Sequence, residues 1–311
     1  MELIKTNYFL EKDLLKTNFD IVIASTGFES RASYFIQKFN INAELKICFG
    51  FTEYSDNIVR KNNDAVFLAS EFEIILESGN SGKGVLEFLS SRALQKDNSE
   101  INILVDYSCM TRVWYSAILK FFRYIESSKK IVNIYFSYSF SKFIKPPTEI
   151  AYNKYVGPLD GFYSITIPSK PSALIIGLGY IQERAYGLAE FFDVEPYVFL
   201  SDSSVNVDYF NEVCENNKNL LSSIKSDNIF YYPLSNLKYA ETLLSQLIKD
   251  LLDDFRIILA PSGPKPFTLI SLLAAFRFEN VDVWRISAGE EELPTNKEAS
   301  GSFSFFHATF K

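Results

Sequence analysis

Short apolar runs alternate along the chain with segments whose apolar residues recur at helical spacing. Val113–Ile125 carries its apolar residues on one face, whereas Phe267–Phe276 is apolar nearly all round and predicts a well-buried helix. Short strands that alternate with helices favour right-handed crossovers and mostly parallel sheets. We therefore expect an α/β fold with Rossmann-like, doubly wound sheets. The predicted strands are residues 19–24, 45–50, 72–76, 101–105 and 132–137, and then 173–176, 197–200, 229–232, 256–260 and 281–286.

This strand pattern occurs twice in the 311 residues, which exceed the usual size of one domain. In each half the first strand leads into a loop that reads glycine, an aromatic residue, polar residues and then Arg-Ala at a helix start. These loops are Gly27–Ala32 and Gly179–Ala185. The matched loops and the matched strand order indicate an internal duplication. We expect two tandem domains, residues 1–145 and 172–311, joined by a linker at residues 146–171 that is rich in Pro and Gly.

The composition narrows the class of protein. The apolar fraction of 47% predicts a full core, and the net charge of −7 argues against binding to extended duplex nucleic acid or an anionic membrane. The apolar runs are too short to span a bilayer, and the first residues lack a signal-peptide pattern. Three scattered cysteines favour a reduced, cytoplasmic location. His307 is the only histidine, so a His-rich metal site is excluded.

Polar loops follow the first and fourth strands of each half, where open parallel sheets bind their ligands. In the first half, Asp106 ends the fourth strand, and Ser108, Thr111 and Arg112 follow at a helix start. Helix N-terminal amides and a guanidinium attract anions, so this loop suits a phosphate or a ribose. Asp106 would accept from a ribose hydroxyl or act as an acid or base. The alternative is that Ser108 or Thr111 only caps the helix while Asp106 pairs with Arg112.

The fourth-strand loop of the second half holds Ser262, Gly263 and Lys265 among three prolines, which predicts a rigid, preorganised loop. Gly263 would allow close approach of a ligand, and Lys265 would bring positive charge. Ala260 stands where the first half has Asp106, so chemistry that depends on this acid would be confined to the first half.

The first-strand loops add Thr26, Glu29 and Arg31 in the first half, and Glu183 and Arg184 in the second. These residues would either contact a ligand or form a Glu-Arg pair at the surface.

Two familiar motifs are incomplete. Gly79–Gly84 is similar to a phosphate-binding P-loop, but Glu77 replaces its first glycine and Gly84 replaces the Ser/Thr that binds magnesium. Gly177 and Gly179 supply only two glycines of a dinucleotide fingerprint. We expect a turn at the first motif, and the second gives only weak support for NAD binding.

These loops resemble those of the CARF family, which are Rossmann-like sensors of cyclic oligonucleotides, and of the SAVED fold, in which two such modules are fused. The turn Ser262–Lys265 is similar to the small turn after the fourth strand of that family, and Asp106–Arg112 looks like a more distant version. Thr26 and Glu29 match only the position of the first-strand loop. The resemblance covers nearly the whole chain as architecture. It implies ligand binding by these loops and an output through a separate effector protein.

The resulting hypothesis is a nucleotide-binding protein whose two halves form one composite pocket, with a cyclic or phosphorylated nucleotide of a prokaryotic defence or stress pathway as its signal. Phosphate contacts are assigned to Arg31, Arg112, Arg184 and Lys265, and contacts to ribose or base edges to Asp106, Ser108 and Ser262.

Two alternatives stay open. One is an enzyme that acts on a nucleotide or phosphoribosyl substrate, like a phosphoribosyltransferase or a nucleotide hydrolase, with Asp106 as acid or base. The other is a structural subunit of a protein complex. The sequence shows no all-protein metal site, so magnesium would enter only with the phosphates of a ligand, and the oligomeric state stays open.

Overall fold

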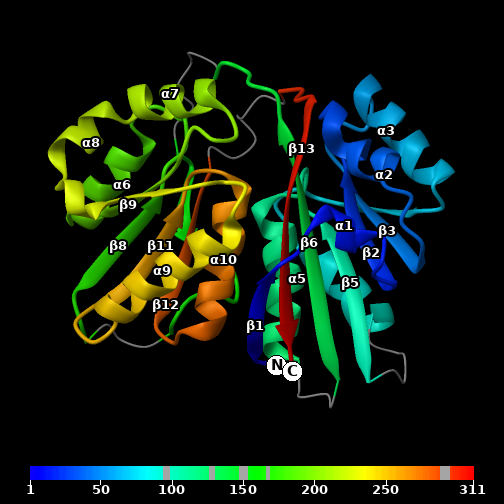
Figure 1. The fold of residues 1–311 in the computed structure, drawn as a ribbon, viewed down its shortest axis with the longest axis horizontal. Coiled ribbons are helices and arrows are strands. Elements are labelled where there is room, and N and C mark those ends of the chain that lie inside the picture. The colour runs from blue at the N-terminus through cyan, green and yellow to red at the C-terminus, as the bar shows by residue number, and fades with distance from the viewer. Residues whose placement is uncertain (94–98, 126–129, 147–152, 166–168, 288–294) are drawn as a thin grey trace. The chain divides into compact units, whose positions relative to one another are not determined.

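The computed structural model describes residues 1–93, 99–125, 130–146, 153–165, 169–287 and 295–311. The chain is an α/β protein with two mostly parallel mixed sheets of seven and six strands, interleaved with helices (Figure 1). It divides into two compact units, Met1–Lys142 with Pro294–Lys311, and Phe143–Leu293. The predicted fold class is confirmed.

The first unit is built on the seven-stranded sheet, with the order β1-β13-β6-β5-β2-β3-β4. Strands β2 to β6 run parallel, whereas β13 is antiparallel to both β6 and β1. The strands are β1 (Leu3–Tyr8), β2 (Phe19–Thr26), β3 (Ala43–Phe51), β4 (Glu73–Glu77), β5 (Glu100–Asp106), β6 (Ile131–Ser141) and β13 (Ala299–Phe310). The helices are α1 (Glu11–Leu14), the 3₁₀ turn η1 (Ser30–Ser33), α2 (Tyr34–Lys38), α3 (Ile58–Ala69), α4 (Lys83–Phe88), the π turn η2 (Leu89–Ala93) and α5 (Arg112–Tyr124).

The second unit is built on the six-stranded sheet, with the order β10-β9-β8-β11-β12-β7. Only β7 runs antiparallel to its neighbour. The strands are β7 (Tyr155–Pro158), β8 (Ser172–Gly177), β9 (Tyr197–Ser201), β10 (Ile229–Tyr232), β11 (Arg256–Pro261) and β12 (Val281–Ser287). The helices are α6 (Arg184–Phe192), α7 (Val207–Asn216), α8 (Lys218–Ser223), η3 (Ser226–Asn228), α9 (Leu237–Leu251) and α10 (Lys265–Arg277).

The two sheets share one strand order. The order β4-β3-β2-β5-β6 in the first unit corresponds to β10-β9-β8-β11-β12 in the second. In both, the chain first winds toward one edge and then returns to the other side of its first strand, as in a Rossmann fold. The switch point, where such folds bind ligands, therefore lies between β2 and β5 and between β8 and β11.

Successive strand residues pack on opposite faces of each sheet. In β3, Cys48 lies in the core cluster shared with α2 and α3, whereas the Phe49 ring contacts Phe88 of α4 and Trp114 of α5. In the second unit, the Phe199 ring of β9 contacts Phe267 of α10 with a centroid distance of 5.2 Å. The buried interior of α10 confirms the all-round apolar prediction for this segment. Helices thus cover both faces of each sheet.

Three strands lie outside the predicted set: β1, β7 and β13. The structure places β13 in the first sheet, although the sequence assigned residues 172–311 to the second domain. The chain ends meet there, because Glu2 N donates to Lys311 O (2.7 Å) and Lys311 N donates to Glu2 O (3.0 Å) (Figure 1). The described part of the expected linker contains β7, which pairs with β12. The alternating residues of β13 indicate a strand, but the local pattern does not say which distant strand it pairs with.

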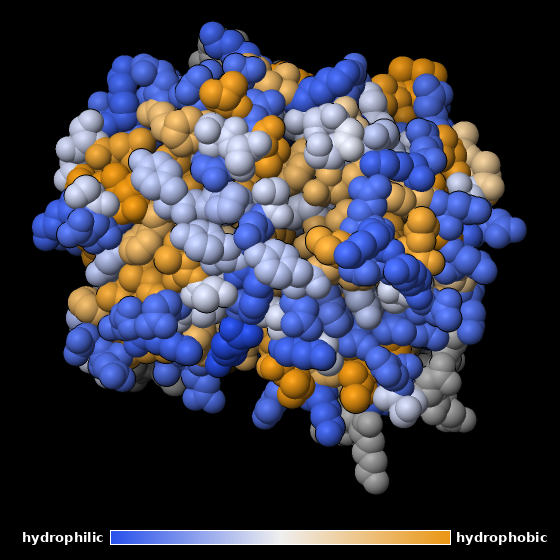
Figure 2. Space-filling view, in the orientation of Figure 1, coloured by the Kyte–Doolittle hydropathy of each residue, from blue (hydrophilic) through white to orange (hydrophobic). Residues whose placement is uncertain are grey.

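Hydrophilic and hydrophobic residues are interspersed over the face of the molecule drawn in Figure 2. Within the described ranges, no helix combines the length and the apolar character that crossing a membrane requires.

Candidate functional site

Arg31 is buried at the switch point of the first sheet, with 2% of its surface exposed. Its Nε lies 2.6 Å from Glu29 Oε2, its Nη1 donates to Ser139 O (2.6 Å), and its Nη2 donates to Ser108 O (3.2 Å). The guanidinium also lies over the Tyr138 ring, 5.3 Å from its centroid. The charge of Arg31 is therefore engaged by groups of the protein itself.

Asp106 and Ser108 form the next part of this network. Ser108 Oγ donates to Asp106 Oδ1 (2.5 Å), and Ser108 N donates to the same oxygen (3.1 Å). Ser108 Oγ in turn accepts from Ser139 N (2.8 Å). Burial raises the pKa of Asp106 to about 6, against the opposing effects of the Ser108 hydrogen bonds and the Arg31 charge. Asp106 is thus a buried carboxyl whose hydrogen bonds from Ser108 hold the loop that follows β5.

Asn63, on α3, fastens the loop that follows β2. Its Nδ2 donates to Gly27 O and to Glu29 O, each at 2.9 Å. Its Oδ1 accepts from Ser33 Oγ (2.7 Å). Sequence reasoning missed Asn63, because nothing but its place on a helix distinguishes it from the other asparagines of the chain.

The remaining predicted residues of the first unit have local roles. Thr26 is buried and its Oγ1 donates to Asp64 Oδ1 (2.6 Å). The Thr111 side chain caps α5 by accepting from Trp114 N (3.3 Å), which is the capping part of the alternative prediction. Its other part, a pair between Asp106 and Arg112, stays a prediction, and Arg112 is the first residue of that helix.

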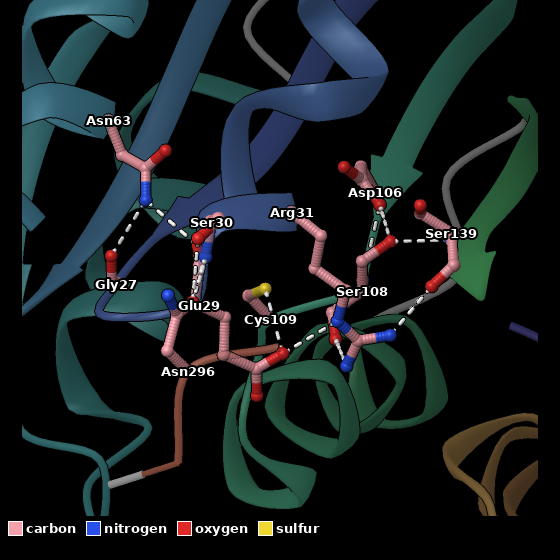
Figure 3. Close-up of polar contacts among 10 residues, drawn as sticks. All are labelled: Gly27, Glu29, Ser30, Arg31, Asn63, Asp106, Ser108, Cys109, Ser139 and Asn296. Atoms are coloured by element: carbon pink, nitrogen blue, oxygen red, sulfur yellow. Dashed lines mark hydrogen bonds and ion pairs between the residues drawn. The ribbon is translucent and has the colours of Figure 1, made fainter. Parts of the chain in front are cut away.

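The structure therefore gathers Glu29, Arg31, Asp106 and Ser108 into one network, in which they bond to each other and to nearby backbone (Figure 3). The space between the β2 and β5 loops is occupied by the protein's own polar groups.

The corresponding place in the second unit holds a pocket. It is a shallow depression, since its empty volume of about 150 Å³ includes open solvent and encloses no room for a water molecule. The residues that line it come from the β8 loop and the start of α6, from the α7–α8 junction and from the β11 loop: Gly179, Ile181, Arg184, Ala185, Asn217 and Ser262. The pocket thus lies at the carboxyl ends of β8 and β11, the switch point of this sheet. Of the predicted site residues, Arg184 and Ser262 line it.

Two glycines allow the loops beside this pocket to touch. A Cβ on Gly263 would lie 2.1 Å from Leu178 O, and a Cβ on Gly179 would lie 2.4 Å from Ser262 O. Both contacts are with backbone, which cannot swing aside. The close approach that Gly263 permits is therefore to the β8 loop, and it fixes the two loops against each other.

Asn217 presents an acceptor at this pocket. The residue is 1% exposed, and its Nδ2 donates to Gly179 O and Val213 O, each at 2.8 Å. Because both partners are carbonyls, the opposite orientation of the amide would set Oδ1 against two oxygens. Asn217 Oδ1 is buried and has no hydrogen-bond partner in the described part of the chain, and the same holds for Ser262 Oγ.

Glu183 and Lys265 flank the pocket-lining residues. Glu183 has a left-handed backbone (φ 56°), and its Oε1 accepts from Asn219 Nδ2 (2.8 Å). Lys265 is the first residue of α10, two positions beyond Gly263, and is half-buried.

The strand registers align the two sites position by position. Ile23 of β2 pairs with Val105 of β5, and Ile175 of β8 pairs with Leu259 of β11. Continued past the strand ends, these registers match Gly27 with Gly179, Asp106 with Ala260 and Ser108 with Ser262. Asn63 matches Asn217 because each donates to the carbonyl oxygen of the matched glycine. Ser33 matches Tyr186 in the sequence alone, as the residue after Arg31-Ala32 and after Arg184-Ala185.

Two differences between the units change the hydrogen bonding at the second site. Ser108 Oγ has Asp106 to donate to, whereas Ser262 has only the methyl group of Ala260 at that position. Asn63 Oδ1 has Ser33 as a donor, whereas Asn217 Oδ1 has no donor in the described part of the chain.

The loop that is similar to a P-loop is bound by carboxylates of the protein. Glu77 accepts from Ser78 N (2.9 Å) and from Gly84 N, and Glu53 accepts from Ser78 Oγ (2.8 Å) and Gly79 N (3.3 Å). These amides point at acidic side chains, which would repel a phosphate.

No group of three or more His, Cys, Asp or Glu side chains that could hold a metal ion occurs among the residues that the structure describes.

No model of a known protein family matches the chain, and no curated protein matches it significantly.

Proposed function

We propose that the second unit binds a phosphate-bearing small molecule, with a nucleotide as the favoured class, in the pocket between the β8 and β11 loops. One observation carries this proposal: the positions that are filled by mutually bonded side chains in the first unit surround a pocket in the second. The pocket lies at the switch point, where Rossmann-like sheets bind nucleotides.

The chemistry of the pocket favours an anion. Arg184 supplies a guanidinium from a side chain that is 7% exposed, and guanidinium groups bind phosphate oxygens bidentately. The β11 loop leads directly into α10, a helix of 13 residues whose N-terminal end carries partial positive charge. Lys265 adds a second cation at this helix end.

The size of the pocket limits what it encloses. Sites that enclose a whole drug-sized ligand measure about 300–1,000 Å³. The depression between the β8 and β11 loops encloses no such volume, so the phosphate of a ligand would contact its rim. The base of the nucleotide would lie outside this pocket.

Binding without turnover is the favoured activity of this pocket. Ala260 replaces the acid that ends the corresponding strand of the first unit, so this strand end supplies no general acid or base. A signalling nucleotide, read out by a separate effector protein, would fit such a site. That both units contribute to one composite pocket stays a prediction.

Thermal-shift measurements with cyclic and linear nucleotides, followed by titration calorimetry, test the proposal. A ligand at 100 times its Kd should stabilise the fold by about 2.7 kcal/mol. Ser262→Ala and Lys265→Gln should weaken binding. The matched controls Ser203→Ala, an exposed serine in the β9 loop, and Lys249→Gln, an exposed lysine of α9, should not. A panel in which no nucleotide shifts the melting temperature would refute the proposal.

A further inference from the structure

We infer that the ligand of this pocket donates a hydroxyl group to Asn217 Oδ1, which identifies it as a ribose phosphate rather than a bare or deoxyribose phosphate. The inference rests on the proposed function and specifies the ligand of the same site. It starts from the buried carbonyl oxygen of Asn217, which has no hydrogen-bond partner in the described part of the chain.

An acceptor in this position calls for a donor. Buried side-chain oxygens are nearly always hydrogen-bonded, because leaving one unsatisfied is costly. Asn217 cannot relieve this by turning its amide, since Nδ2 is held by Gly179 O and Val213 O. The oxygen therefore keeps its place among the residues that line the pocket.

The first unit shows how the same asparagine is completed when no pocket is present. There Asn63 holds the corresponding glycine, and Ser33 Oγ donates to Asn63 Oδ1 over 2.7 Å. In the sequence, Tyr186 follows Arg184-Ala185 as Ser33 follows Arg31-Ala32, and the Tyr186 side chain is 37% exposed. The hydroxyl that Ser33 supplies in one unit is thus left for a ligand in the other.

The neighbours of Asn217 determine which donor fits. Arg184 lines the same small pocket and favours an anion, while Asn217 Oδ1 repels the oxygens of an ionised phosphate, which only accept. Both demands are met by a phosphate with a hydroxyl a few bonds away, as in ribose phosphates. Ser262 Oγ, which both donates and accepts, can bond to either group.

Calorimetric titration of the full chain tests the inference. The probes are adenosine 5′-monophosphate, its 2′-deoxy and 3′-deoxy forms, inosine 5′-monophosphate, and the diadenylate pApA with its deoxy counterpart. Loss of the hydroxyl that Asn217 binds should weaken binding at least tenfold. Replacing the 6-amino group of the base, as in the inosine probe, should change affinity much less.

A variant that restores the arrangement of the first unit provides a second measurement. Tyr186→Ser should supply an internal donor to Asn217, lower the affinity for the ribose probe and reduce the difference between the ribose and deoxyribose probes. Tyr239→Ser, which removes an exposed tyrosine from the first turn of α9, is the control and should change neither value.

The outcomes separate the two proposals. Equal affinity for ribose and deoxyribose probes would overturn the inference and leave the phosphate site standing. A large loss for the inosine probe alone would also overturn it, because the donor would then be the base amino group. If none of the ribose or deoxyribose probes bound, the proposed function itself would fall.

Discussion

Asn63 and Asn217 make the same hydrogen bond in the two units, each donating Nδ2 to the carbonyl oxygen of the glycine in the loop after the first parallel strand. The distances are 2.9 Å to Gly27 O and 2.8 Å to Gly179 O. The two side chains differ at the other end of the amide, where only Asn63 has a hydroxyl donor. The two switch points therefore differ in whether the amide of this asparagine is fully hydrogen-bonded within the described chain.

Alanine substitutions should reveal this difference in the free energy of unfolding. Asn63→Ala removes three hydrogen bonds and should cost about 3 kcal/mol, because the carbonyl groups that it leaves behind are poorly satisfied. Asn217→Ala removes two and also removes an unsatisfied oxygen, so it should cost about 1 kcal/mol less. The chain has two tryptophans, Trp114 in the first unit and Trp284 in the second. Urea unfolding followed by fluorescence in single-tryptophan backgrounds therefore assigns each loss to its unit. Equal losses would contradict the different satisfaction of the two amides.

The close contact between the β8 and β11 loops beside the pocket predicts that adding one methyl group there is strongly destabilising. Gly263→Ala would drive a methyl group onto Leu178 O and should destabilise the second unit by about 2–3 kcal/mol. Gly187→Ala is the matched control, since a Cβ there meets nothing within 4 Å. This residue lies within α6, so alanine should stabilise the unit by about 0.5–1 kcal/mol. The urea midpoint of each variant, followed by Trp284 fluorescence, measures both changes. An unchanged midpoint for Gly263→Ala would show that the two loops do not touch.

Asp106 should make the first unit less stable as the pH rises from about 4 to about 6. Burial raises the pKa of this carboxyl from 3.8 to about 6, so in this window the folded state holds a proton that the unfolded state has released. Asp106→Asn removes the titration while keeping an oxygen for Ser108. Relative to wild type, the variant should gain about 3 kcal/mol between pH 4 and pH 7. Urea unfolding at both pH values, read from Trp114, measures this gain. Parallel curves for the two proteins would show that Asp106 is already ionised in the folded state at pH 4.

His307 should titrate far below its ordinary range. Burial, followed by the nearby charge of Lys5, lowers its pKa from 6.5 to about 4. The ring stacks on Tyr135 with centroids 4.3 Å apart, and its Nε2 lies 3.2 Å from Asn133 Oδ1. Because it is the only histidine, one imidazole signal in the NMR spectrum follows it directly. We expect a midpoint near pH 4, and a midpoint at 6.5 would contradict the burial of the ring.

The sign of the His307 contribution is opposite to that of Asp106. The unfolded chain takes up a proton near pH 6.5 and the folded chain only near pH 4, so this residue lowers stability as the pH falls through that window. His307→Gln should reduce the acid sensitivity of the first unit. The double variant with Asp106→Asn separates the two effects, since their windows overlap.

The sequence by itself determined the fold class, the parallel strands of each Rossmann-like sheet and the polar loops in which the site was predicted. Apolar periodicity is a local property, and so are a strand end and a helix start. Arg184 and Ser262 could therefore be proposed as site residues before their surroundings were known, and both line the pocket.

Only the tertiary structure decided how the polar groups of the two matched sites are hydrogen-bonded. Arg31 and Arg184 occupy equivalent loops, yet Arg31 donates to the Ser108 and Ser139 carbonyls, partners that lie 77 and 108 residues away along the chain. The pairing of β13 with β6 and the anchoring roles of Asn63 and Asn217 are long-range in the same way. Such contacts join residues that are far apart in the sequence, so a local pattern of apolar and polar residues does not predict them.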